Sequence, residues 1–181
     1  MDLIFTIDVI ILMVLLSGTV WSVVIPEKRI WPPPARASWQ YWTVWLLFTA
    51  VFVMSAVLMV FDWNSWIFTS QVRLIVGLPL AILGGSLTVW GIRTLGIVNT
   101  SGLANGFTAM GPYQFTRNPQ YLGDICLLLG LSITANSAYL WIANFLLILV
   151  FLITPLSEEP WLTDQYGEAY KSYKRETPRF L

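Results

Sequence analysis

The stretch YLGDICLLLGLSITANSAYLWIANFLLILVFLITPL, residues 121–156, decides the fold. It holds two apolar runs, Tyr121–Ala135 and Ala138–Leu156, which only Asn136–Ser137 separates. A helix that crosses the hydrocarbon core of a bilayer needs about 20 apolar residues. The second run is long enough, whereas the first is shorter and carries Asp124. Because two residues suffice to join antiparallel helices, this stretch predicts a tight helical hairpin.

The composition of the whole chain agrees with a membrane protein. Its 181 residues are 56% hydrophobic and 11% charged, with a mean hydropathy of +0.68, whereas soluble domains carry about 25% charged residues. Ten tryptophans suit a protein with two water–lipid interfaces. Three more stretches are long enough to span: Leu3–Ile25, Trp42–Phe61 and Leu74–Ile92. We therefore predict an all-α polytopic membrane protein with about five transmembrane helices, the first retained as an anchor because no basic leader or cleavage site accompanies it.

The basic residues predict an orientation. With five spans, the loop 26–41, the loop 93–118 and the C-terminal tail lie on one side of the membrane. That side receives nine of the ten basic residues, and Arg73 lies on the other: Lys28, Arg29, Arg36, Arg93, Arg117, Lys171, Lys174, Arg175 and Arg179. Cytoplasmic loops are enriched in Lys and Arg. The N-terminus is therefore expected outside, and the tail and the 93–118 loop in the cytoplasm.

The composition also excludes several kinds of chemistry. The chain has no histidine and one cysteine, Cys126. This excludes a histidine base, a Cys/His metal cluster and an intrachain disulfide. The zero net charge gives no reason to expect a nucleic-acid partner, and no metal is expected. Catalysis has to use carboxylates, Arg, Lys, Tyr, amides or the backbone.

Glycines recur at seven-residue intervals in two of the apolar stretches. They are Gly77, Gly84 and Gly91 in one stretch, and Gly123 and Gly130 in the other. Small residues at such intervals let helices approach closely in lipid. We interpret them as packing residues rather than as part of a site.

The tail EEPWLTDQYGEAYKSYKRETPRFL, residues 158–181, differs from the rest of the chain. Pro160 suits the first turn of a helix. Leu162, Tyr166, Ala169 or Tyr170, and Tyr173 then recur at helical spacing, and Lys171, Lys174 and Arg175 form a polar face. This pattern predicts an amphipathic helix that lies on the cytoplasmic membrane surface.

Ionisable residues within or beside the spans invite functional hypotheses, because they are costly in lipid. Asp8 lies near the outer end of the first span, where it is expected to reach the interface in a structural or neutral role. Asp124 is either a salt partner of Arg117 or a ligand contact. Arg117 is either an interfacial snorkelling residue or an anion clamp. Glu158 and Glu159 suit the N-terminal cap of the tail helix slightly better than a ligand site.

Two motifs resemble a known superfamily. GPYQFTRNPQYLG, residues 111–123, is followed by the hairpin and then by the tail motif. Together they resemble the isoprenylcysteine carboxyl methyltransferase and phospholipid methyltransferase superfamily. Its pattern is approximately Gly-x-Tyr-x-x-x-Arg-His-Pro-x-Tyr-x-Gly, a hairpin, Glu-Glu and Tyr-Gly-x-x-Tyr-x-x-Tyr, ending near Pro-Arg-Phe. The resemblance covers the chain from Gly111 onward.

The resemblance implies that S-adenosylmethionine binds on the cytoplasmic side, between the last two spans and the tail. It divides the chain into a scaffold with an acceptor pocket, residues 1–96, and a cofactor-binding part, residues 97–181. It implies catalytic roles for Arg117 and Glu159. The cofactor-binding residues that it implies are Gly111, Pro112, Tyr113, Asn118, Pro119, Tyr121, Leu122, Glu158, Glu159, Tyr166 and Tyr170.

The acceptor that the resemblance implies is lipophilic, either an isoprenylcysteine-like carboxylate or a lipid, and enters sideways from the bilayer. Asn118 replaces the usual histidine of the family. An amide donates and accepts hydrogen bonds but does not titrate near neutral pH, which favours a binding role. Since methyl transfer depends on positioning and electrostatics, the absence of histidine favours an acceptor that is already nucleophilic.

Two alternatives remain at this point. NPQYLGD, residues 118–124, resembles the corresponding stretch of NADPH-dependent membrane sterol reductases, and Asp124 raises that option. A non-catalytic membrane scaffold of the same fold is the other, with Asn118 in its favour. Binding of S-adenosylmethionine, of NADPH or of neither separates the three hypotheses.

Overall fold

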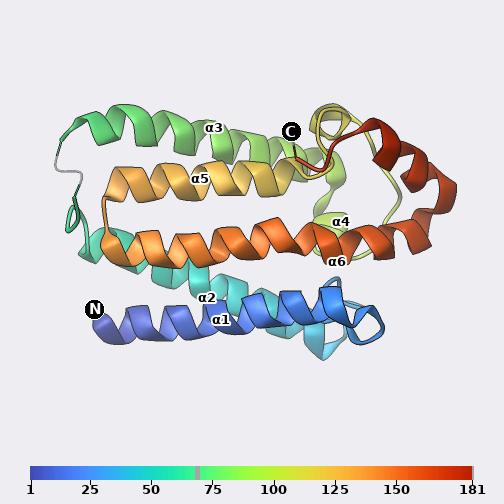
Figure 1. Cartoon of the computed structure of the whole chain (residues 1–181), viewed down its shortest axis with the longest axis horizontal. Coiled ribbons are helices and arrows are strands. Elements are labelled where there is room, and N and C mark those ends of the chain that lie inside the picture. Colours follow the sequence, from blue (N-terminus) through green and yellow to red (C-terminus); the bar gives the residue numbers. More distant parts are fainter. Residues whose placement is uncertain (68–69, 181) are drawn as a thin grey trace.

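The computed structural model describes residues 1–67 and 70–180; Leu181, the last residue of the tail motif, lies outside these ranges. The described residues form helices and no strand, which confirms the all-α prediction (Figure 1). In chain order the elements are α1 (Asp2–Val24), η1 (Pro26–Lys28), α2 (Trp39–Phe61), α3 (Val72–Leu95), α4 (Ile97–Thr100), η2 (Gly111–Gln114), α5 (Pro119–Ala135) and α6 (Ala138–Glu176).

Four of these helices, α1, α2, α3 and α6, are long and apolar enough to cross a membrane. Helix α5 has 17 residues, which is about 26 Å at 1.5 Å per residue. It lies between α3 and α6 along the same long axis (Figure 1). The five predicted stretches therefore form one helical bundle. The short stretch Tyr121–Ala135 corresponds to α5.

The hairpin between α5 and α6 confirms the prediction from residues 121–156. Asn136 ends α5 in the left-handed conformation, with φ 51° and ψ 43°. Ser137 then caps α6, since its hydroxyl accepts a hydrogen bond from the Leu140 N–H at 3.0 Å. We call this end of the bundle the hairpin end, and the opposite end, where α6 reaches Glu158, the tail end.

The glycines of α3 and α5 bring these two helices into backbone contact. A Cβ atom on Gly84 would lie 2.6 Å from the Gly123 carbonyl oxygen and 2.4 Å from the Leu127 nitrogen. A Cβ atom on Gly130 would lie 2.7 Å from the Gly77 carbonyl oxygen. These distances leave no room for a side chain, so the packing interpretation of the glycines is confirmed.

The predicted start of a separate tail helix at Pro160 is wrong. The tail is helical, but no separate helix begins at Pro160, because α6 continues through Pro155 and Pro160. A proline removes one backbone donor, which a long, well-packed helix tolerates. Glu158 and Glu159 therefore lie inside a helix, and the cap interpretation is wrong. The chain instead turns at Gly167, with φ 55° and ψ −130°, and the last helical turns fold back over the tail end (Figure 1).

The apolar side of the folded-back segment is covered by protein. Tyr170 and Tyr173 are only 3% and 9% exposed. They pack with Tyr113 of η2 in a small core of their own. The apolar side of this segment thus packs against protein, and its place on the cytoplasmic membrane surface stays a prediction.

The main core lies where α1, α2, α5 and α6 meet. Its buried residues are Leu12, Leu15, Val51, Leu128, Ala143, Leu147, Val150 and Phe151. Asp8 faces the same interior, with a relative exposure of 0%. The expectation that Asp8 reaches the interface is therefore wrong, because its position on α1 points into the bundle.

Candidate active site

Three segments that are far apart in the sequence meet at the tail end. Trp31, in the loop after η1, donates from Nε1 to the Glu158 carboxylate at 2.7 Å. Thr116 and Asn118, before α5, donate to the Arg179 carbonyl oxygen at 3.1 and 2.9 Å. The predicted placement of both basic loops and the tail at one end of the bundle is confirmed.

A polar cavity lies among these segments. Its walls come from the loop after α4, the start of α5 and the stretch of α6 from Pro155 to Tyr173. Eight of the twelve predicted site residues line it: Tyr113, Arg117, Asn118, Tyr121, Glu158, Glu159, Tyr166 and Tyr170. The other four, Gly111, Pro112, Pro119 and Leu122, do not line it. Gly111 and Pro112 belong to η2 and Pro119 begins α5, so they shape the backbone that carries the lining residues.

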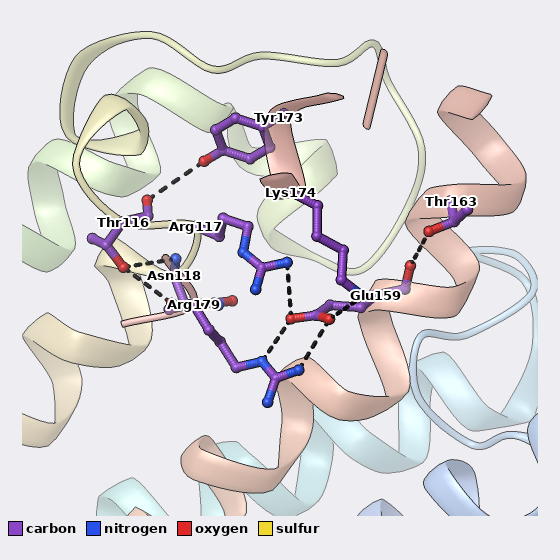
Figure 2. Close-up of polar contacts among 8 residues, drawn as sticks. All are labelled: Thr116, Arg117, Asn118, Glu159, Thr163, Tyr173, Lys174 and Arg179. Atoms are coloured by element: carbon purple, nitrogen blue, oxygen red, sulfur yellow. Dashed lines mark hydrogen bonds and ion pairs between the residues drawn. The ribbon is translucent and has the colours of Figure 1, made fainter. Parts of the chain in front are cut away.

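Glu159 lies at the centre of a charge cluster (Figure 2). Its Oε1 accepts from the Arg179 Nε at 2.6 Å, and its Oε2 from the Arg179 Nη2 at 3.0 Å. Lys174 Nζ lies 2.7 Å from Oε2, and Arg117 Nη1 lies 3.2 Å from Oε1. One buried carboxylate thus holds three cations, and Arg117 is the one of them that lines the cavity.

Arg117 is the buried member of this cluster. Its side chain is 8% exposed. Its Nε and Nη1 atoms form no hydrogen bond with the described residues. Arg117 does not pair with Asp124 in the described structure, which settles that alternative: Asp124 accepts a hydrogen bond from the Thr88 hydroxyl at 2.9 Å. Because Nη1 is directed at the Glu159 carboxylate, Nε is the donor that this buried guanidinium keeps for an anionic ligand.

A C-terminal strap, residues 177–180, is fastened to the turn before α5. The Arg117 N–H donates to the Pro178 carbonyl oxygen at 2.9 Å. Asn118, which stands where the family has histidine, uses its Nδ2 to hold the Arg179 carbonyl oxygen. The strap in turn brings the Arg179 side chain to Glu159 (Figure 2).

The second carboxylate of the pair, Glu158, has a different environment. Besides Trp31, it accepts a hydrogen bond from the Tyr121 hydroxyl at 2.6 Å, on the same Oε1. The Tyr121 ring stacks on Phe151 with 5.6 Å between centroids. Adjacent glutamates therefore face different partners, one cations and the other neutral donors.

Aromatic rings close the polar cavity on the side of the folded-back segment. Phe107 contacts Tyr166, Tyr170 and Tyr173 with centroid distances of 5.6, 6.2 and 5.5 Å. The Tyr173 hydroxyl donates to the Tyr113 carbonyl oxygen at 2.6 Å. Burial raises the pKa of the Tyr113 phenol well above its usual range, so this hydroxyl stays neutral.

A second, apolar cavity lies deeper in the bundle, with a volume of about 360 Å³. All five long helices contribute to its walls, which are mainly aliphatic and aromatic. The two cavities share Thr100, Gln120 and Tyr121. Asp124 lines the apolar cavity beside Thr88, and it is the only acidic side chain that does so in the part of the chain that the structure describes.

Comparison with known proteins adds a family to this geometry. A family model described as phospholipid methyltransferase matches residues 72–169, which run from the start of α3 through both glutamates. The chain belongs to the phospholipid methyltransferase family.

A similar curated protein is phosphatidylethanolamine N-methyltransferase B of Dictyostelium discoideum. It is 30% identical over 154 residues, which cover 77% of this chain and 74% of that protein. No solved structure matches the chain significantly. This family membership and the apolar helices make the protein an integral membrane methyltransferase that acts on a lipophilic acceptor. They do not favour the sterol-reductase and scaffold alternatives.

Several polar contacts of the site are not predictable from the sequence. Trp31 and Thr88 come from the N-terminal half, and no spacing pattern pairs them with Glu158 and Asp124. The sequence indicates only that a buried carboxylate needs hydrogen-bond donors, and not which residues supply them. Among the described residues, no group of three or more His, Cys, Asp or Glu side chains could hold a metal ion.

Proposed function

We propose that S-adenosylmethionine binds in the polar cavity and that a phospholipid with an amine headgroup binds in the apolar cavity. Methyl transfer then takes place where the two cavities meet. The observation that carries this proposal is a pair of adjoining cavities, one with Arg117, Glu158 and Glu159 in its wall and the other lined mainly by aliphatic and aromatic side chains. The two cavities share Thr100, Gln120 and Tyr121. A water-soluble cofactor and a lipid acceptor require such a pair.

The residues of the polar cavity fit the cofactor. S-adenosylmethionine carries a carboxylate, and the buried Arg117 has an unused donor at Nε. Its adenine ring requires an aromatic surface, which Phe107 and the tail tyrosines supply. When bound, the cofactor supplies an electrophilic methyl group on a sulfonium.

Glu159 acts through Arg117 in this proposal. Both of its oxygens are already occupied by cations, so it has little capacity left for a ligand. We therefore assign it the role of a positioning residue, which holds Arg117 at the cavity wall. Glu158 has a free Oε2 in the described hydrogen-bond network and is the carboxylate that remains for polar groups of the cofactor.

The polar cavity has a volume of about 100 Å³, below the roughly 300–1,000 Å³ of typical small-molecule sites. The structure therefore corresponds to a closed state. The loop 101–110 and the folded-back segment cover the cavity, and the Tyr166 hydroxyl of α6 donates to the Gly106 carbonyl oxygen of that loop at 3.2 Å. We infer that these segments open to admit the cofactor.

Two observations support an amine lipid as the acceptor: Asp124 lines the apolar cavity, and a similar protein is named as an N-methyltransferase of phosphatidylethanolamine. A carboxylate in the apolar cavity attracts an ammonium headgroup and repels a carboxylate acceptor. The sequence alone favoured an acceptor that is already nucleophilic. With Asp124 facing the cavity, an amine becomes possible: one Asp124 oxygen accepts the proton of the ammonium, and the nitrogen lone pair becomes free to attack.

The test uses the full chain in mild detergent with two readouts. Calorimetry measures binding of S-adenosylhomocysteine, and transfer of a labelled methyl group is measured with phosphatidylethanolamine in mixed micelles. We expect Arg117→Ala to lose most of the cofactor affinity, and Asp124→Asn to keep it while methyl transfer falls about 100-fold.

The outcomes separate the parts of the proposal. A folded wild-type protein that binds no S-adenosylhomocysteine contradicts the cofactor assignment, and NADPH is then the next ligand to titrate. Binding followed by transfer to a prenylcysteine carboxylate, but not to the amine lipid, contradicts only the acceptor class.

A further inference from the structure

Asp8 lies in the membrane-embedded core, away from both cavities. It is 0% exposed, and neither of its carboxylate oxygens has a hydrogen-bond partner among the described residues. It lines neither the polar nor the apolar cavity. A carboxylate in apolar surroundings is costly unless its charge is neutralised and its oxygens are bonded.

Two more buried oxygens lack hydrogen-bond partners in the described part of the chain, on two other helices. They are the Ser55 Oγ of α2 and the Asn144 Oδ1 of α6. Ser55 is 9% and Asn144 2% exposed. The Asn144 Nδ2 donates to the Leu128 carbonyl oxygen and to the Ser132 hydroxyl on α5. Its amide nitrogen is thus used toward α5, while the amide oxygen remains available.

The three residues lie at a similar level along their helices. Leu12, Val51 and Leu147 belong to one core cluster. Asp8 precedes Leu12 by four residues, Ser55 follows Val51 by four, and Asn144 precedes Leu147 by three. Residues three or four apart share a helix face. Each of the three therefore lies one helical turn from that core residue, on the face that its helix presents to the core.

In all three helices this displacement of one turn is toward the hairpin end of the bundle. Helices α1 and α6 both start at the hairpin end, where the Tyr139 hydroxyl donates to Asp2 at 2.6 Å. Helix α2 ends there, where the Asn64 N–H donates to the Ala135 carbonyl oxygen at 2.8 Å. Asp8, Asn144 and Ser55 each lie six residues from that end of their helix, which is about 9 Å.

We propose that this layer binds a monovalent cation, with Na⁺ as the ion tested. Two carboxylate oxygens, one hydroxyl and one amide oxygen are hard ligands of the kind that such cations take. A single positive charge neutralises the single carboxylate, whereas a divalent ion would leave a net charge in the apolar interior. The cation connects α1, α2 and α6, whose residues Leu15, Val44 and Phe151 line the apolar cavity.

The experiment measures thermal unfolding of the full chain in non-ionic detergent, by tryptophan fluorescence, in NaCl and in choline chloride of equal ionic strength. At a sodium concentration of about ten times Kd, we expect Tm to rise by roughly 3–6 °C. The rise should vanish in Asp8→Asn and shrink in Ser55→Ala. It should persist in Asp2→Asn, because Asp2 is exposed on the same helix.

Equal Tm values of the wild-type protein in the two salts overturn the proposal, and this result does not depend on whether any variant folds. A sodium-dependent rise that survives Asp8→Asn overturns it as well. A rise of the same size in KCl supports a monovalent site without selectivity. Neither outcome depends on methyl transfer, so the cation site and the proposed function fail separately.

Discussion

Glu159 is the residue on which the geometry of the tail end depends most. Replacing it by Gln removes the one carboxylate that holds Arg117, Lys174 and Arg179 together. Lys174 and Arg179 are partly exposed and recover hydration, but Arg117 is buried. We expect Glu159→Gln to destabilise the protein by about 2–4 kcal/mol, measured as a fall in Tm in detergent.

The matched control is Glu168→Gln. Glu168 is also a glutamate of α6 in an ion pair, with Lys171 at 2.7 Å, but its side chain is 78% exposed. Exposed pairs contribute little to stability, so this variant should unfold like the wild-type protein. Equal Tm values for both variants would contradict the structural role of Glu159.

The sequence predicted which residues belong to the site where a charged side chain lies beside an apolar span. Arg117 and Glu158 stand out because charges are rare beside the spans, and both line the polar cavity. Their partners were not predictable. Asp8 was misplaced because α1 is apolar almost all round, so the sequence does not show which face turns inward.

At the scale of helices, the α3–α5 contact offers a sharp comparison between neighbouring glycines. A Cβ on Gly84 would meet backbone atoms of α5 at 2.4–2.9 Å, whereas a Cβ on Gly85 would meet only the Leu127 Cδ1 at 3.8 Å. We expect Gly84→Ala to destabilise the bundle by about 3 kcal/mol or more. Gly85→Ala should be neutral or slightly stabilising. Thermal unfolding of both variants in detergent tests this, and equal effects would contradict the close backbone packing.

The turn in α6 depends on Gly167. Its φ of 55° with ψ of −130° is open to glycine and strained for other residues, while no atom lies within 4 Å of an added Cβ. Gly167→Ala thus adds backbone strain of about 1–3 kcal/mol without a clash. We expect the folded-back segment to detach and the affinity for S-adenosylhomocysteine to fall about tenfold, while circular dichroism shows an intact bundle. Unchanged affinity would show that this segment does not cover the cofactor.

Helices themselves were predicted well, because long apolar runs fix their extent. The expected span Trp42–Phe61 became α2 at Trp39–Phe61, and the hairpin turn fell where it was expected. The error at Pro160 arose because proline favours the first turn of a helix and disfavours the interior, whereas α6 continues through Pro155 and Pro160. Only the tertiary contacts of the tail distinguish the two cases.

At the scale of the whole molecule, the orientation in the membrane stays a prediction from the charges. It is tested in a Cys126→Ser background with single cysteines at two exposed positions, Ala169 near the tail end and Ser70 near the hairpin end. In intact cells an impermeant maleimide should label Ser70→Cys from outside. Ala169→Cys should react only after the cells are opened. The reverse pattern would contradict the cytoplasmic placement of the site.

The two-cavity arrangement makes a prediction for the whole molecule, since it separates the binding of cofactor and acceptor. Gly18 of α1 lines the apolar cavity, and a Cβ there would meet only the Ile30 Cδ1 at 3.4 Å. Gly18→Phe should fill part of the cavity, so methyl transfer to the lipid should fall at least tenfold while S-adenosylhomocysteine binds as before. Leu83→Phe, at a 69% exposed position, adds the same side chain toward lipid and should change neither readout. A parallel loss of both readouts in a folded Gly18→Phe protein would show that cofactor and acceptor do not occupy separate cavities.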